Sequence, residues 1–203
     1  NNYFQNLGGS AILVKTGDIE RRTIPKWQYQ KRDGDLRNWG GYQRPEDTLI
    51  AFNTIVNCTL AFSLGERGER SRRYPLPARN ITIANNLITS DREKISRDLG
   101  VWENFTVEGN IFYSSHKKSE LGWVLPQDGY HIADPKLVIK NDLVQLTAQS
   151  PAVDAAMGDY PSVTQDVHGH PRGGQKDIGA DELATTPMRY APLTPSDVGP
   201  SAK

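Results

Sequence analysis

The residues best suited to bind a ligand form a short basic run, GERGERSRRY, at Gly65–Tyr74. The run follows an apolar stretch that reads as a strand, and its arginines outnumber its glutamates by four to two. Guanidinium groups bind carboxylate and sulfate groups through paired, planar hydrogen bonds. We therefore expect an anion-binding loop; the alternative is an exposed loop of mixed charge. The four candidate side chains are Arg67, Arg70, Arg72 and Arg73.

A second stretch suited to binding is Asp18–Tyr42, which is polar and has no clear period. Long ordered loops in compact domains tend to be functional. Its aromatic side chains can stack against sugar rings, although packing of each ring onto the protein is the alternative. Lys15–Arg44 also carries four more basic than acidic residues and can attract a polyanion. The aromatic candidates are Trp27, Tyr29, Trp39 and Tyr42.

The histidines and the single cysteine have weaker claims to chemistry. His116 and His131 have no companion at metal-ligand spacing, so we interpret them as surface or packing residues. His168 and His170 form a His-x-His pair, but two residues beside a turn are a weak metal signal. Cys58 has no partner for a disulfide, and its place in an apolar segment predicts a core residue.

The elements that would position these residues come from a repeated phrase. ITIANNLI at Ile81–Ile88 is matched by Leu49–Val56, by Phe105–Phe112 and, from its midpoint, by Asn1–Phe4. Each copy has alternating apolar residues, a two-residue polar step, and apolar residues again. Superposing the step places Asn1, Asn53, Asn85 and Gly109 at one site, and Asn2, Thr54, Asn86 and Asn110 at the next. Recurrence at short intervals is typical of a solenoid.

Alternating apolar residues predict strands with one buried face. A two-residue step rich in Asn and Gly predicts a sharp corner in the left-handed backbone region, with Asn side chains stacked as a ladder. The predicted fold is all-β, a right-handed parallel β-helix in which each strand pairs with its counterpart one coil away. The alternative is an ordinary β-sandwich, which would show more regular turn signals.

Composition agrees with a loop-rich β protein. The 203 residues include 18 Gly and 13 Pro, the net charge is zero, and no apolar run is long enough to span a membrane. We expect β-helix coils over residues 1–183, with inserted loops at about 18–42, 65–78 and 114–130, and an extended tail at 184–203. Ser90–Gly100 is expected to be a loop with one helical turn, and Asp166–Glu182 to form turns around a closing strand.

Five segments carry a family resemblance: IAFNTIVNC, LPARNITIANNLI, SPAVDAA, DVHGHPRGGQKDIGADE and APLTPSDVGP. Together they resemble the C-terminal half of polysaccharide lyase family 6, which contains alginate lyases and chondroitinase B. The resemblance implies a secreted or periplasmic enzyme that cleaves a uronate polysaccharide by β-elimination. In this family a Lys acts as base, an Arg as acid, and a bound Ca²⁺ commonly neutralises the uronate carboxylate.

The resemblance places the chemistry outside this chain. The family's catalytic Lys and Arg and its calcium ligands precede the phrase that corresponds to Asn1–Phe4, so none has a counterpart here. A family Arg that usually follows this phrase is also missing from Leu7–Ser10. The family binds substrate anions with Arg and Tyr side chains before its LPxxN run, and Arg72, Arg73 and Tyr74 match them best.

We therefore expect a scaffold with part of a sugar-binding groove, inactive by itself. The expected partners are an anionic polysaccharide and the N-terminal half of the same β-helix, on the same or a separate polypeptide; neither nucleic acid nor a membrane is expected. Alginate is the favoured substrate, with dermatan sulfate as the alternative. A non-catalytic polyanion-binding or adhesin subunit is the competing function. A glycoside hydrolase would need a carboxylate cluster that the coils do not supply.

Overall fold

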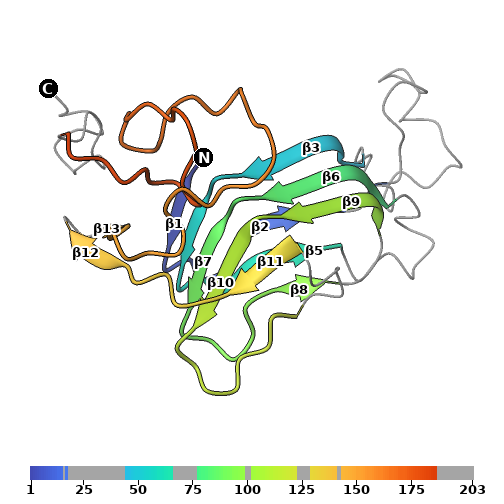
Figure 1. Cartoon of the computed structure of the whole chain (residues 1–203). Coiled ribbons are helices and arrows are strands. Elements are labelled where there is room, and N and C mark those ends of the chain that lie inside the picture. Colours follow the sequence, from blue (N-terminus) through green and yellow to red (C-terminus); the bar gives the residue numbers. More distant parts are fainter. Residues whose placement is uncertain are drawn as a thin grey trace, which may run out of the picture.

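A computed structural model describes residues 1–15, 17, 44–65, 77–98, 102–122, 129–140 and 143–186 (Figure 1). These residues form an all-β structure and contain no helix, and therefore no helix that could span a membrane. The strands are β1 Tyr3–Gln5, β2 Ser10–Val14, β3 Glu46–Ala51, β4 Thr54–Val56, β5 Leu60–Leu64, β6 Ala78–Ala84, β7 Leu87–Ser90, β8 Arg97–Asp98, β9 Trp102–Glu108, β10 Asn110–Ser114, β11 Tyr130–Ile132, β12 Val138–Lys140 and β13 Leu143–Gln145.

Eleven of these strands form three parallel sheets, ordered β1-β4-β7-β10-β11, β2-β5-β8 and β3-β6-β9. The chain passes through the three sheets in a fixed order. β3, β4 and β5 are followed by β6, β7 and β8, and each of these pairs with the corresponding earlier strand (Figure 1). We call each such traversal a pass. The remaining strands, β12 and β13, form a separate antiparallel hairpin.

Alternation within each strand builds the core between the sheets. One column of neighbouring side chains, Phe4, Ile55, Ile88 and Phe112, runs through β1, β4, β7 and β10 in register. The last three are at most 1% exposed. Burying each such side chain contributes about 1.5–3 kcal/mol. Cys58 is buried in the same core cluster, which confirms its predicted place.

Asparagine side chains join the passes in what we call the amide ladder: Asn2, Asn53, Asn86 and Asn110. The Nδ2 atom of each donates to the Oδ1 atom of the next, at 3.0, 2.8 and 2.8 Å. Three of the four side chains are buried, so these bonds satisfy polar groups that water does not reach. The predicted stacking of asparagines at the step is confirmed.

The predicted superposition was wrong by one residue in the second copy. Strand register aligns Thr54 with Tyr3 and Leu87, which places Asn53 in the amide ladder and Phe52 at the corner. Phe52, Asn85 and Gly109 all have a positive φ, of 54°, 53° and 62°. Phenylalanine is uncommon in that region, but here its ring is fully buried, at 0% exposure. The packing of this ring outweighs the local backbone preference.

The corner at Gly109 gives a first testable prediction. A Cβ atom at this position would collide with the Oδ1 atom of Asn85, whose side chain is buried and holds the backbone of Met157. Because φ is also positive, we expect Gly109→Ala to lower the free energy of unfolding by about 2 kcal/mol. Gly9→Ala is the control, since nothing lies within 4 Å of its Cβ position. Equal urea midpoints for the two variants would contradict this packing.

A second ladder, which the sequence did not lead us to expect, lies on the outer face of the sheet β3-β6-β9. Asn104 donates to Asn80 at 3.0 Å, and Asn80 donates to Asp47 at 2.8 Å. All three residues have a positive φ, near 50°. Both intervals equal those between Asn53, Asn86 and Asn110, which is the signal that could have revealed it.

The C-terminal segment, residues 146–186, packs against the outer faces of two sheets. Leu146, Ala152 and Ile178 cover Leu87 and Ile111, while Tyr160 packs edge-on against Phe52 at 5.8 Å between ring centroids. Two predictions were wrong: the closing strand in this segment and the helical turn between β7 and β9. This segment contains no strand, only a bridge between Gln165 and Pro171, because its polar groups bond to one another and to the corners. Of the segment expected to hold a helical turn, residues 91–98 are described, and they form bends and β8 instead.

Candidate functional site

The basic run predicted to bind anions, with Arg67, Arg70, Arg72, Arg73 and Tyr74, lies outside the described residues, as do the four aromatic candidates before Arg44. The strands that flank the run are described. It leaves β5 after Leu64 and returns to β6 at Ala78. Leu64 of β5 is paired with Val14 of β2 on one side and with Asp98 of β8 on the other. The chain segments that lead from β2 to β3, from β5 to β6 and from β8 to β9 therefore start from neighbouring strands.

A row of alternating charge, partly buried at Glu46, marks the sheet edge where these connections return. Glu46, Arg79 and Glu103 are neighbours across β3, β6 and β9. The Glu46 carboxylate accepts from Arg44 at 2.6 Å and from Arg79 at 2.9 Å. The hydrogen bond from Arg44 is the main cause that lowers the pKa of Glu46. This corner therefore holds two ordered guanidinium groups beside the ends of the predicted binding loop.

A buried ionic cluster in the C-terminal segment surrounds Arg172. Its Nη1 atom donates to Glu182 at 2.7 Å and to the Asp177 carbonyl at 3.0 Å, and Nη2 donates to the Gly179 carbonyl at 2.6 Å. The guanidinium carbon lies 4.9 Å from the centre of the Phe52 ring. The Arg172 side chain is 0% exposed, and its contact with Phe52, with that of Lys176 at 5.8 Å, connects the segment to the corner of the passes.

Asp166 organises the other half of the cluster. Its Oδ1 atom accepts from the backbone N–H groups of His168 and His170, and its Oδ2 atom accepts from that of Glu182. The His170 ring bonds to the Asp166 carboxylate at 2.9 Å and to the Thr186 carbonyl at 3.1 Å. The His-x-His pair is therefore buried and hydrogen-bonded. Its structural role could have been anticipated from the Asp-x-x-x-His spacing.

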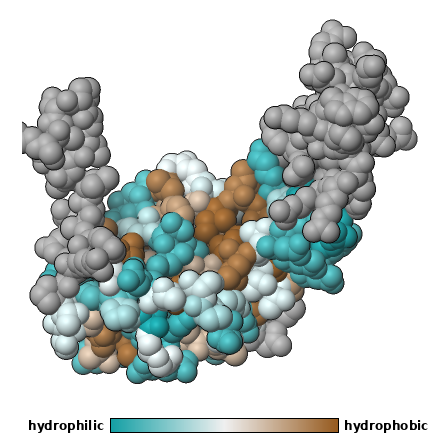
Figure 2. Space-filling model, turned by 90° about the horizontal axis from the view of Figure 1, so that it is seen from above, coloured by the Kyte–Doolittle hydropathy of each residue, from teal (hydrophilic) through white to brown (hydrophobic). Residues whose placement is uncertain are grey.

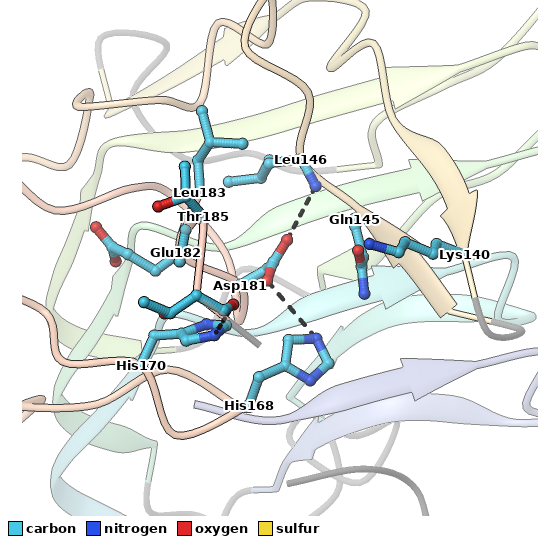
Figure 3. A pocket seen from close by; sticks show the side chains of 11 residues that line it. Lys140, Gln145, Leu146, His168, His170, Asp181, Glu182, Leu183 and Thr185 are labelled. Atoms are coloured by element: carbon cyan, nitrogen blue, oxygen red, sulfur yellow. Dashed lines mark hydrogen bonds and ion pairs between the residues drawn. The ribbon is translucent and has the colours of Figure 1, made fainter. Parts of the chain in front are cut away.

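A cavity of about 370 Å³ lies between this cluster and the β12–β13 hairpin (Figure 3). Asp181 sits on its wall, accepting from the backbone of Leu146 at 2.9 Å and lying 3.6 Å from the His168 ring nitrogen. Lys140 and Gln145 face it from the hairpin. The lining is mixed, because Leu146 and Leu183 lie beside the hydroxyl groups of Thr185 and Thr186.

Burial raises the pKa of two carboxyl groups at this cavity. For Asp181 the hydrogen bond from Leu146 and the nearby His168 partly oppose the effect. For Glu182, burial raises the pKa to about 7, although the Arg172 charge opposes it. The folded chain therefore binds more protons than the unfolded chain between about pH 4.5 and pH 7 at Glu182.

The sign of this shift gives a second prediction. A raised folded-state pKa means that the contribution of Glu182 to stability falls as the pH rises through this window. We expect Glu182→Gln to remove that part of the pH dependence, so the melting temperature should change less between pH 5 and pH 8 than in the parent chain. Glu93→Gln, at an exposed position, should keep the parent slope. If the melting temperature depended on pH in the same way in the parent chain and in Glu182→Gln, the assigned role of Glu182 would be contradicted.

Comparisons with known protein families, with characterised proteins and with solved structures give no match. The site must therefore be judged from its own residues. His116 and His131 are exposed, as expected of surface residues. No group of three or more His, Cys, Asp or Glu side chains in the described ranges could hold a metal ion. These residues do not fit a calcium site, and we assign no step to calcium in this chain.

Proposed function

We propose that this chain is the C-terminal part of a right-handed parallel β-helix that binds and cleaves a uronate polysaccharide, with alginate as the favoured substrate. The passes supply the scaffold, and the loop after β5 supplies part of the substrate groove. The catalytic Lys and Arg and the calcium ligands would belong to the N-terminal half of the same β-helix, carried on the same or a separate polypeptide. The complete protein would act outside the cytoplasm, as a polysaccharide lyase.

One observation supports the proposal: the connection that carries the four arginines leaves β5 after Leu64 and enters β6 at Ala78, next to the corner where Arg79 binds Glu46. Four arginines in one short run favour an anionic ligand. A uronate polymer has one carboxylate on every sugar. The five-segment resemblance described above points to the same ligand class, and the parallel sheets agree with its fold.

Binding of alginate oligosaccharides tests this proposal. We expect Arg72→Ala/Arg73→Ala to weaken binding about tenfold, because two lost guanidinium–carboxylate pairs at about 0.7 kcal/mol each remove roughly 1.4 kcal/mol. Lys117→Ala/Lys118→Ala removes the same charge from another exposed loop and should leave the affinity within about twofold. Isothermal titration calorimetry measures both. Equal losses in the two double variants would show a non-specific charge effect and contradict the assigned groove.

A further inference from the structure

Residues 183–186, which we call the rim, form one wall of the cavity beside the ionic cluster (Figure 3). All four are exposed, so burial contributes little to holding them in place. Seen from above Figure 1, apolar residues gather in the middle of the face, and largely hydrophilic residues surround them (Figure 2). The rim depends instead on polar contacts, and one of them joins the His170 ring to the Thr186 carbonyl at 3.1 Å.

The partner on the other side of this ring is the buried Asp166 carboxylate. Its two oxygens accept from the backbone N–H groups of His168, His170 and Glu182. With three N–H groups directed at it, the carboxylate acts as an acceptor in its ionised form. The Asp166 side chain is 0% exposed, and a buried negative charge requires a positive charge close by.

Both ring nitrogens of His170 face acceptors. The Nδ1 atom lies 2.9 Å from the Asp166 carboxylate, and the Nε2 atom faces the Thr186 carbonyl. Neither acceptor has a hydrogen to donate, so each contact is a hydrogen bond only when the nitrogen carries a proton. A neutral imidazole carries one proton and makes one of the two bonds, whereas an imidazolium makes both. The geometry therefore matches the charged ring, which also compensates Asp166.

Other charged and titratable groups surround this pair from the same turn, from the rim's own stretch of chain and from the β12–β13 hairpin. They are His168, Arg172, Asp177, Asp181, Glu182 and Lys140. The carboxylates favour a charged His170 ring, and the cations oppose it. Because Glu182 is itself paired with Arg172, these two effects partly offset each other. Asp166, in direct contact with the ring, is the main partner of its charge.

We propose that His170 is a pH-sensitive latch: its charged ring holds the rim against the cavity through Thr186, and loss of its proton releases the rim. The proton on Nδ1 would stay, because its bond to a carboxylate is the stronger one. The Nε2 lone pair would then face the Thr186 carbonyl and be repelled by it. A histidine that gains acceptors on folding contributes stability that is present at low pH and lost as the pH rises. The cavity is therefore closed at low pH and opens at high pH, whether or not the chain binds a uronate.

Heteronuclear NMR on the parent chain tests the latch directly. At about pH 5.5, both His170 ring nitrogens should carry a proton, and the backbone order parameters of the rim should be near about 0.85. By about pH 9, the Nε2 proton should be lost, and these order parameters should fall below about 0.6. A ring that is neutral at the lower pH, that keeps both protons at the higher pH, or that loses one while the rim stays rigid would overturn the proposal.

Two variants show whether His170 is the group that titrates. His170→Gln cannot change its charge, so the mobility of its rim should be the same at both pH values. His131→Gln, at an exposed position on β11, should keep the response of the parent chain. A parent-like response in His170→Gln would overturn the proposal, because another group would then control the rim. If His170→Gln does not fold, the ring protons and rim mobility of the parent chain decide the question. No polysaccharide enters these measurements, so failure here is distinguishable from failure of the proposed function.

Discussion

Replacing Arg172 with alanine is expected to lower the free energy of unfolding by about 3–5 kcal/mol, the largest effect of any single substitution considered. The variant leaves the partly buried carboxylate of Glu182 without its cation and removes the donor to the Asp177 and Gly179 carbonyls. It also removes the cation that packs on Phe52, at the corner between β3 and β4. Equilibrium unfolding in urea measures the loss.

Two further variants make this expectation specific. Arg92→Ala breaks an ion pair with Asp91 whose side chains are 56% and 53% exposed, and it should cost less than about 1 kcal/mol. Arg172→Ala/Glu182→Gln should recover part of the stability lost in Arg172→Ala, because no buried charge is then left unpaired. An Arg172→Ala loss as small as that of Arg92→Ala would show that the ionic cluster does not hold the C-terminal segment in place.

The second large effect is expected at the centre of the amide ladder. Asn86 accepts from the backbone and side chain of Asn53, and it donates to Asn110 and to the Ile50 carbonyl. All of this lies in the core, where an unsatisfied polar group costs about 1–3 kcal/mol. Asn86→Ala leaves several such groups, and we expect a loss of about 3–4 kcal/mol in the free energy of unfolding.

The outer ladder supplies the matched control. Asn104→Ala removes one side-chain hydrogen bond, to Asn80, at an exposed position. The loss in the free energy of unfolding should stay below about 1 kcal/mol, because water replaces the missing partner. Asn86→Asp is also informative, since it keeps the shape and the acceptors but loses the hydrogen bonds that Nδ2 donates to Ile50, Ala84 and Asn110. Similar losses of unfolding free energy for Asn86→Ala and Asn104→Ala would contradict a large contribution of the amide ladder to stability.

The strands and the stacked asparagines were predictable because both depend on local pattern. Alternation located β3, β6 and β9, and the recurrence of Asn identified the corner. The register of the second copy was predicted wrongly because the residues were aligned by chemical type, which paired Asn53 with Asn85. The buried ladder position requires an amide, whereas the corner accepts Phe52 once its ring is packed by Tyr160 and Arg172. That packing joins residues more than 100 positions apart, and no local pattern reveals it.

The candidate site was less predictable than the fold. Arginines in a short run predict a binding loop by charge alone, but the partner that orients Arg79 is Glu46, which comes from the preceding pass. The ionic cluster around Arg172 was missed because its acidic residues suggested turns. Only the folded segment brings Asp166, Asp177 and Glu182 around one guanidinium.

The most direct test of the polyuronate-binding function compares two polymers on the unmodified chain. Isothermal titration calorimetry with alginate oligosaccharides and with neutral β-1,4-glucan oligosaccharides of equal length separates charge recognition from general sugar binding. We expect the alginate oligosaccharides to bind at least tenfold more tightly, and we expect their binding to weaken as salt is raised, because salt screens guanidinium–carboxylate attraction. Equal affinity for the two polymers, or alginate binding that salt does not weaken, would contradict the proposed function.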